Sequence, residues 1–338
     1  MKCTSRRINA AIAVCILASF LAGCCGLKYD FAYDPDYGVS SFQVTNVSQE
    51  LDTPSFAQNL CIVSGDTGLV GSSLEGLSLD KAGAACLFDL NNSEVLYSKN
   101  AHERLNPASL TKIMTALVAI ENGSMDQLLT ATDQVRITES GAQLCGLKTG
   151  DRMTLDQALH ILLMYSANDV AMLIAENIGG SIEGFVEMMN AEAVRLGATN
   201  THFANPHGLT EENHYTTAYD LYLIFNEALK YEDMTQIMHM TTYDTVYTDG
   251  QGNSKELSVK TTNRYLRGDF SPPENVTVIG GKTGTTNAAG HCLILLTRDT
   301  SGNSYVSVIL RDENSDDLYT DMTGLLRKIN GTPPDNNN

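Results

Sequence analysis

The sequence has no C-x-x-C motif, no internal repeat and few basic residues. Its eight cysteines include no C-x-x-C pair, so neither a zinc site nor a dense disulfide framework is indicated. Lysine and arginine total 22 against 40 aspartates and glutamates, which gives a formal charge of -18. Because such a surface repels phosphate, the composition argues against nucleic acid as a partner. The low aromatic share, 7%, does not suggest a fibre or a coiled coil.

The N-terminus lacks an apolar run long enough for a membrane-spanning helix. Its apolar stretch covers Ala10–Leu21 behind a basic start, whereas a spanning helix needs about 20 residues. A transmembrane anchor is the alternative, but no basic stop follows, so the layout favours a secretory signal over residues 1–23. The sequence LAGC at residues 21–24 resembles the lipobox of bacterial lipoproteins, in which the cysteine is acylated. We therefore expect an extracytoplasmic protein, anchored to the cell membrane by a lipid on Cys24.

The rest of the chain divides by its patterning into a tether, one domain and a short tail. Residues 24–80 lack sustained periodicity and are predicted to form a tether, and residues 331–338 a disordered tail. Residues 81–330 carry alternating apolar residues at both ends and helical periodicity in the middle. This order predicts an α/β domain of the α+β type, with an antiparallel sheet built from both ends and a helical lobe inserted between them.

Local patterns predict where individual strands and helices lie. The expected strands span residues 82–90, 94–99, 275–286, 291–299 and 304–312. The expected helices span residues 109–121, 154–165, 168–178, 181–196, 217–230 and 318–329. The second of these helices opens on a capping box, Thr154-x-x-Gln157.

Three short motifs carry the chemistry, and each occurs twice. S-x-x-K, S-x-N and K-T-G together are the signature of penicillin-binding proteins and class A β-lactamases. They occur at Ser78 and Ser109, at Ser166 and Ser301, and at Lys148 and Lys282, respectively. The required order leaves only Ser166 and Lys282, because Lys148 precedes both S-x-N sites and Ser301 follows both K-T-G sites. Context favours Ser109, because Ser78 lies in the predicted tether.

The surroundings of the selected motifs support this choice. Ser109 stands at the start of an amphipathic helix, and Lys112 lies one turn on along the same face. N–H groups and the helix dipole favour a developing negative charge at that position. Taken alone, Ser109 and Asn168 are also ordinary helix caps and Lys112 a solvated side chain. Lys282 lies in alternating apolar sequence, whose glycines, including Gly284, would let a ligand backbone approach a strand edge.

Four longer blocks make the motifs specific: NAHERLNPASLTKIMTALVAIE, LKTGDRMTLDQALHILLMYSANDVA, FANPHGLTEENHYTTAYDL and GGKTGTTNAAGHCL. Over residues 81–330 the chain resembles the D-alanyl-D-alanine carboxypeptidases, the low-molecular-weight penicillin-binding proteins of serine peptidase family S11. The resemblance implies a penicillin-binding, β-lactamase-like fold and removal of the terminal D-Ala from peptidoglycan stem peptides. It also implies β-lactam antibiotics as covalent inhibitors, and neither a cofactor nor a metal.

The resemblance implies a role for each matching residue. Ser109 is the expected nucleophile, Lys112 its base and Ser166 a relay that passes a proton to the leaving amine. Burial beside Lys282 would lower the pKa of Lys112 toward that task. The residues expected to bind substrate are Asn168, Lys282, Thr283, Gly284 and Thr285. By analogy with the family, the N–H groups of Ser109 and Thr285 form the oxyanion hole.

One departure from the family concerns the terminal carboxylate of the substrate. Many members place an arginine just before the last helix to help hold this carboxylate. Here residues 315–322 read SDDLYTDM, and the nearest basic residue is Arg311. Carboxylate binding is therefore expected to be weaker or arranged differently.

Three other functions compete with the carboxypeptidase. A β-lactamase needs an E-x-x-L-N-like loop after S-x-N, and none is found. A non-hydrolytic sensor or scaffold that binds penicillin or wall peptide stays open, because slow deacylation leaves no mark in a sequence. A metallopeptidase is weaker, because His102-Glu103 lacks a second histidine at metal spacing. Surface or structural roles are expected for His202, His207 and His214.

Overall fold

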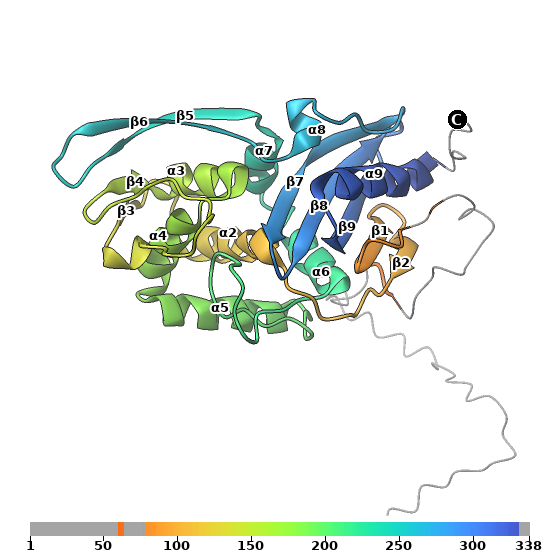
Figure 1. Ribbon diagram of the computed structural model, residues 1–338, viewed down its shortest axis with the longest axis horizontal. Coiled ribbons are helices and arrows are strands. Elements are labelled where there is room, and N and C mark those ends of the chain that lie inside the picture. The colour runs from red at the N-terminus through yellow and green to blue at the C-terminus, as the bar shows by residue number, and fades with distance from the viewer. Residues whose placement is uncertain (1–59, 64–76, 78, 331–338) are drawn as a thin grey trace, which may run out of the picture. The chain divides into compact units, whose positions relative to one another are not determined.

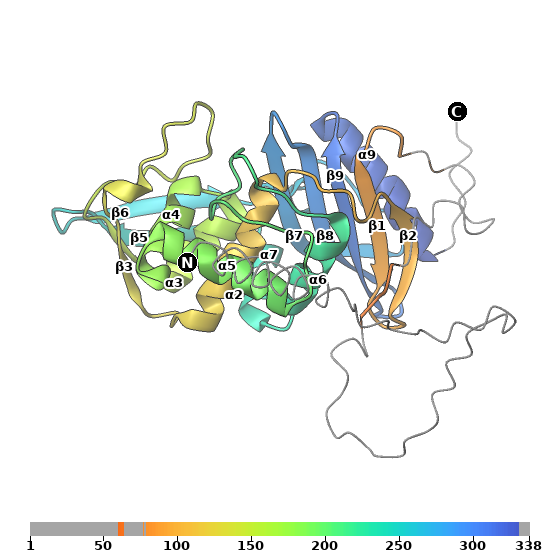
Figure 2. The same ribbon diagram turned by 90° about the horizontal axis from the view of Figure 1, so that it is seen from below.

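Strands from the beginning and the end of the domain form one antiparallel sheet. The computed structural model describes residues 60–63, 77 and 79–330, and within them this sheet has the order β2-β1-β9-β8-β7. Its strands are β1 (Ala84–Asp89), β2 (Glu94–Lys99), β7 (Val276–Thr286), β8 (Gly290–Asp299) and β9 (Ser304–Asp312). Figure 2 shows β1 beside β9, so the first strand of the domain pairs with the last. The predicted sheet built from both ends is confirmed.

Both faces of this sheet are buried, which explains the nearly continuous apolar sequence of its central strands. Leu293 and Leu295 of β8 pack in one core with α9 (Ser315–Leu326), while Cys292 and Ile294 belong to the core beneath the helical lobe. The alternation follows from the pleat, which sends successive side chains to opposite faces. In Figure 1, α9 lies across one face of the sheet, and the helical lobe extends from the β7 side.

The helical lobe is built around α2 (Thr111–Asn122), which is buried from Thr111 to Ala119. The other helical elements before β7 are η3 (Ala108–Leu110), η4 (Asp133–Val135), α3 (Leu155–His160), η5 (Ile161–Tyr165), α4 (Asn168–Gly179), α5 (Ile182–Arg195), α6 (Ala218–Ala228), α7 (Glu232–His239) and α8 (Arg264–Arg267). Of these, α4, α5 and α6 pack directly against α2. The last element described is η6 (Arg327–Asn330), which follows α9.

A second antiparallel sheet covers the lobe. Its order is β3-β4-β5-β6, with strands β3 (Leu128–Thr130), β4 (Arg152–Thr154), β5 (Thr242–Thr248) and β6 (Ser254–Lys260). Figure 1 shows the β5–β6 hairpin running along the top of the lobe. No element is predicted from the sequence between residues 230 and 275, where the structure has α7, β5, β6 and α8. The β5–β6 hairpin is not predictable from its sequence, because most of its residues are partly or fully exposed and its pattern of apolar residues is therefore weak.

The predicted helices are confirmed, with differences at their ends. Thr154 and Gln157 form the predicted capping box. The helix they open then widens into the π-helical turn η5 and stops at Ser166, whose φ is 69°. The last helix begins at Ser315, earlier than predicted, because the side chain of Asn314 accepts the N–H groups of the residues two and three positions on.

Few residues of the predicted tether belong to the described ranges. Cys61 is fully buried against α6: its N–H donates to the Tyr222 hydroxyl at 2.9 Å, and its carbonyl accepts from the Tyr219 hydroxyl at 3.0 Å. The predicted signal segment, Cys24 and the predicted tail lie outside the described residues, so these predictions stand untested. Within the part of the chain that the structure describes, no helix is both long enough and apolar enough to span a membrane.

Candidate active site

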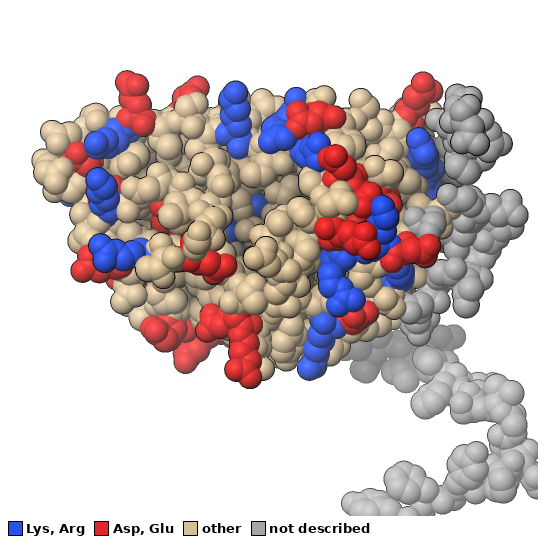
Figure 3. Space-filling view, in the orientation of Figure 1, with Lys and Arg blue, Asp and Glu red and all other residues tan. Residues whose placement is uncertain are grey.

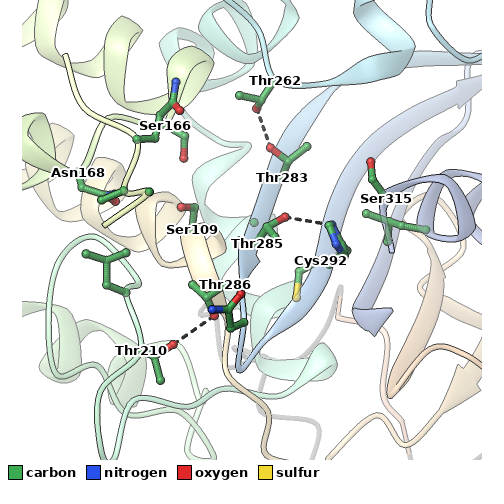
Figure 4. Close-up of a pocket in the computed structure, with 18 of the residues that line it drawn as sticks. Ser109, Ser166, Asn168, Thr210, Thr262, Thr283, Thr285, Thr286, Cys292 and Ser315 are labelled. Carbon is green, nitrogen blue, oxygen red and sulfur yellow. Dashed lines mark hydrogen bonds between the residues drawn. The ribbon is translucent and has the colours of Figure 1, made fainter. Parts of the chain in front are cut away.

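A cavity of about 800 Å³ lies between the edge strand β7 and the helical lobe. Its walls come from η3, the loop residues 139–143, the junction of η5 with α4, β7, α8 and the start of α9. Figure 3 shows the surface hollowed between lobe and sheet. Inside it, Ser109 lies between Ser166 and Asn168 on one side and Thr283 and Thr285 on the other (Figure 4). The fold therefore brings the three selected motifs to one cleft.

Ser109 is held at an abrupt turn of the chain. It lies in η3, directly before α2 rather than inside it, and the preceding Ala108 has a left-handed φ of 47°. The Thr111 hydroxyl donates to the Ala108 carbonyl at 2.8 Å, and a Cβ on Gly208 would lie 1.9 Å from the same oxygen. A non-glycine residue in this conformation is strained and needs such support from its surroundings. The packed turn thus presents Ser109 to the cleft.

Lys112 is fully buried and has three acceptors around its amine. Its Nζ lies 3.0 Å from Ser109 Oγ, 2.7 Å from Asn168 Oδ1 and 2.5 Å from the carbonyl oxygen of His207. Burial, with the charge of Lys282 as a smaller cause, holds the pKa of Lys112 well below its ordinary value. The amine therefore loses its proton more readily than an exposed lysine does. Asn168 is not a helix cap, because Ala167 occupies that position.

Lys282 and Ser166 form the second pair in the cleft. Lys282 Nζ donates to Ser166 Oγ at 2.8 Å and to the Thr283 carbonyl at 2.9 Å. Lys282 is 1% exposed, and this burial lowers its pKa to about 7. Ser166 reaches the strand because its left-handed backbone turns the chain between η5 and α4. A small change in surroundings therefore decides whether Lys282 is charged.

Gly280 and Gly284, on either side of Lys282, serve packing within the protein. A Cβ on Gly284 would lie 2.9 Å from Ser109 N, and one on Gly280 would lie 2.9 Å from the Met238 carbonyl oxygen. Gly284 also lines the cleft, so the approach of a ligand backbone stays a prediction for these glycines. They let β7 lie directly against η3 and α7, which brings the strand beside the serine turn.

The two threonines on β7 have partners that the sequence analysis did not name. Thr283 Oγ1 lies 2.6 Å from Thr262 Oγ1, and Thr285 Oγ1 lies 3.2 Å from His291 Nδ1 (Figure 4). Thr262 lies just before α8, in the region where no element was predicted. Asn263 caps the start of this short helix and Gly268 ends it, and this pair of residues is the sequence signal that could have revealed α8.

The described residues of the second motif copies lie away from the cleft. Ser78 lies outside the described residues, and its motif partner Lys81 pairs with Asp317 at 2.8 Å. Lys148 lies in a loop, where its N–H donates to Asp151. Ser301 lies in the turn between β8 and β9. Order and context thus selected the copies that the fold assembles.

The arginines in the cleft differ from the one that the sequence analysis named. Arg311 lies 3.7 Å from Glu103 and does not line the cavity. Arg264 and Arg267 of α8 do line it. Arg264 donates to Ser315 Oγ and to Asp316 Oδ1, so its guanidinium is already partly engaged.

Two of the histidines lie under the serine turn and act as neutral packing groups. His214 Nδ1 accepts the Ala204 N–H at 3.0 Å, which leaves its Nε2–H to donate to the Thr111 hydroxyl at 2.8 Å. Burial lowers the pKa of His214 to about 4 and that of His207 to about 3. Across residues 60–63, 77 and 79–330, no three His, Cys, Asp or Glu side chains are grouped to hold a metal ion.

A family model described as D-alanyl-D-alanine carboxypeptidase matches residues 77–314, which include all three motifs of the cleft. The chain belongs to this family. DacF, a D-alanyl-D-alanine carboxypeptidase of Bacillus subtilis (strain 168), is 40% identical over 218 residues, 63% of this chain and 53% of DacF. DacC of Escherichia coli (strain K12), also a D-alanyl-D-alanine carboxypeptidase, is 31% identical over 232 residues, 66% of this chain and 54% of DacC. The chain thus spans about half the length of these two family members.

Solved structures place the fold in the same group. The Streptomyces K15 DD-transpeptidase superposes with a TM-score of 0.67 at 26% identity, over 73% of this chain and 96% of its own. A penicillin-binding protein homologue from Mycobacterium tuberculosis gives a TM-score of 0.65 at 26% identity, over 75% and 93%. The predicted penicillin-binding-protein fold is confirmed.

Proposed function

We propose that the protein is a serine-type D-Ala-D-Ala carboxypeptidase that acts on peptidoglycan stem peptides through an acyl-enzyme on Ser109. One observation carries the proposal. An uncharged amine has two N–H bonds and one lone pair, and two neighbours of Lys112 Nζ, Asn168 Oδ1 and the His207 carbonyl, can only accept. These two acceptors take both N–H groups. The lone pair then faces the third neighbour, Ser109 Oγ, at 3.0 Å, as a general base requires.

The reaction follows from this geometry. Lys112 takes the hydroxyl proton while Ser109 Oγ attacks the carbonyl carbon of the penultimate D-Ala, and the N–H groups of Ser109 and Thr285 hold the oxyanion. The intermediate collapses to an ester, and the C–N bond to the terminal D-Ala breaks. The proton on Lys112 passes through Ser166 to the leaving amine. Water then hydrolyses the ester, with Lys112 again as the base.

The terminal carboxylate is held at β7. Lys282 supplies the charge, and the hydroxyls of Thr283 and Thr285 supply hydrogen bonds. Asn168 accepts from Lys112 and donates to a substrate carbonyl through its amide nitrogen. Gly284 keeps this strand against the serine turn, so that the carboxylate site and Ser109 stay at a fixed separation. An arriving carboxylate also favours the charged form of Lys282.

β-Lactam antibiotics would acylate the same serine. Attack by Ser109 opens the four-membered ring, but the amine that leaves the carbonyl stays tethered to the adduct. The leaving group therefore continues to occupy the cleft, and water reaches the ester slowly. A long-lived penicillin adduct is the expected signature.

The test compares D-Ala release from a pentapeptide with the lifetime of a fluorescent penicillin adduct. We expect fast peptide turnover, a long-lived adduct and full resistance to EDTA. Ser109→Ala should abolish release and labelling, whereas Ser78→Ala, the matched control, should change neither. Fast penicillin turnover would instead identify a β-lactamase, and turnover of neither compound a sensor or scaffold. Equal losses in the two variants would refute the assignment of Ser109.

We also propose that the protein acts outside the cytoplasm, held at the membrane by a lipid on Cys24. The support is the signal pattern over residues 1–23 and the LAGC sequence that ends it. Mass spectrometry of the membrane fraction should show a diacylglyceryl group on an N-terminal Cys24. A cleaved protein with an unmodified Cys24 in the soluble fraction would reject this proposal.

A further inference from the structure

One buried carboxylate holds the loop of residues 139–147, here called the wall loop. Asp169 is the second residue of α4 and is 2% exposed. Its Oδ1 accepts the Cys145 N–H at 2.9 Å, and its Oδ2 accepts the N–H groups of Gly146 at 2.7 Å and Leu147 at 3.0 Å. A fourth donor, the N–H of Val170, lies 3.0 Å from Oδ1. Four donors fill the acceptor sites of the carboxylate.

The shape of the wall loop suits this anchor. Gly146 has a φ of 90°, a conformation that turns successive N–H groups toward one anion. A Cβ on Gly146 would meet nothing within 4 Å, so the backbone conformation, and not lack of space, favours glycine here. The loop conformation thus directs three successive amide N–H groups to the Asp169 carboxylate.

The same stretch of α4 also reaches the proposed catalytic groups. Asn168 donates its N–H to the Gln143 carbonyl at 2.8 Å, while its side chain accepts from Lys112. Residues 139–143 of the wall loop line the cleft. Two adjacent residues, Asn168 and Asp169, thus connect the wall of the cleft with the amine beside Ser109.

We propose that Asp169 is a positioning residue for acyl transfer, which fixes the wall loop and the Asn168 amide relative to each other. Asp169 makes no hydrogen bond to Ser109 or Lys112 and acts through its neighbours. The inference rests on the proposed function, because this alignment matters only if Ser109 is acylated. Loss of the anchor would loosen the substrate wall and the orientation of the Lys112 amine together.

Asp169 also acts on Lys112 through its charge. Lys112 is faced by Lys282 from β7, by Asp169 from α4, and by the neutral His207 and His214. Burial, and to a smaller extent Lys282, lowers the pKa of Lys112, and the Asp169 charge opposes that lowering. Without the Asp169 charge the pKa of Lys112 falls further, so the amine stays uncharged to lower pH. A loosened loop alone would not move the acid limb of the pH profile in this direction.

The experiment compares Asp169→Asn with Asp220→Asn in the full chain. Asp220 is a matched control: it is 2% exposed, lies in the first turn of α6, and accepts the N–H of Asn200 and the hydroxyl of Thr201. It does not line the cleft. The measurements are hydrogen exchange at residues 145–147 and the second-order rate of acylation by fluorescent penicillin against pH.

For Asp169→Asn we expect faster exchange at residues 145–147, acylation slowed about tenfold per folded molecule, and an acid limb moved to lower pH. Asp220→Asn should acylate within about twofold of the wild type with its acid limb in place. Each of three results would overturn the proposal. They are an acylation rate of Asp169→Asn within about twofold of the wild type, an equal loss of acylation rate in Asp220→Asn, and an acid limb that does not move in Asp169→Asn.

A second variant, Gly146→Ala, tests the positioning role if Asp169→Asn does not fold. Gly146→Ala disfavours the loop conformation and leaves the Asp169 charge in place. It should speed exchange at residues 145–147 and slow acylation without moving the acid limb. Wild-type acylation despite faster exchange would overturn the positioning role. A wild-type protein that never reacts with penicillin would instead refute the proposed function, while hydrogen exchange would still report the anchor.

Discussion

The amine of Lys282 donates a hydrogen bond to the hydroxyl of Ser166 at 2.8 Å, which joins β7 to the end of η5 across the cleft. Lys282 is 1% exposed and Ser166 is 7% exposed, so the contact lies inside the protein. One partner belongs to the sheet and the other to the helical lobe. The proposed relay and the proposed carboxylate site are therefore coupled through the packing of these two parts.

Activity should depend on pH in a bell shape. Lys112 must be uncharged to accept a proton, and its lowered pKa places the loss of rate on the acid side well below the ordinary lysine range. Lys282 must be charged to hold the carboxylate, and its pKa of about 7 predicts a KM that rises at alkaline pH. The measurement is kcat and KM for a pentapeptide across the pH range.

A peptide with an amidated C-terminus is the control for this profile. It has no carboxylate for Lys282 to hold, so its KM should not rise on the alkaline side. If kcat/KM for the free acid instead climbed steadily to about pH 10, both lysines would behave as ordinary exposed amines, against the burial on which the prediction depends.

Replacing Thr262 by valine should weaken substrate binding. Thr262 Oγ1 lies 2.6 Å from Thr283 Oγ1, so valine of nearly the same shape removes the partner that orients the Thr283 hydroxyl. We expect kcat/KM to fall about threefold to tenfold, mainly through KM, because one hydrogen bond is lost. Thr262→Ser keeps the hydroxyl and should restore most of the activity. Similar kinetics in the valine and serine variants would show that packing, not hydrogen bonding, matters there.

Side chains with a distinctive order along the chain could be predicted from the sequence, and groups of the main chain could not. Ser109, Lys112, Ser166 and Lys282 were selected because S-x-x-K, S-x-N and K-T-G must occur in that order. The carbonyl of His207 accepts from Lys112, yet every residue carries a carbonyl, so no letter of the sequence marks it. From the sequence alone, only a surface or structural role is expected for this histidine.

The same reason explains why the wall loop was missed. Three amide N–H groups that converge on Asp169 depend on the loop conformation, and a glycine such as Gly146 does not by itself reveal that conformation in a sequence. The α8 arginines were missed because that helix has only four residues and follows an exposed hairpin. Strands β1, β8 and β9 were predictable because their apolar residues are buried on both faces of the sheet.

Gly284→Ala should reduce acylation strongly. The added Cβ would lie 2.9 Å from Ser109 N and 3.1 Å from the Pro107 carbonyl oxygen, so either β7 or η3 must shift. We expect the acylation rate to fall at least about tenfold, because overpacking at this contact moves the nucleophile relative to the carboxylate site. Gly324→Ala in α9 is the control, since its Cβ would approach only the end of a leucine side chain. Equal acylation rates in the two variants would contradict the packing role of Gly284.

Lys282→Met should make the stability of the fold less dependent on pH. The folded-state pKa of Lys282 is about 7, against 10.5 for an unperturbed lysine, so between these values the unfolded chain holds a proton that the folded protein does not. The free energy of unfolding then rises with pH through this window, by up to about 1.4 kcal/mol per pH unit for this group. Methionine removes that contribution, and the slope that remains includes the one from Lys112. Denaturant unfolding at several pH values measures this slope. Lys148 is exposed, so the control variant Lys148→Met is expected to follow the wild type. Parallel plots of unfolding free energy against pH for all three proteins would mean that Lys282 keeps its charge when buried.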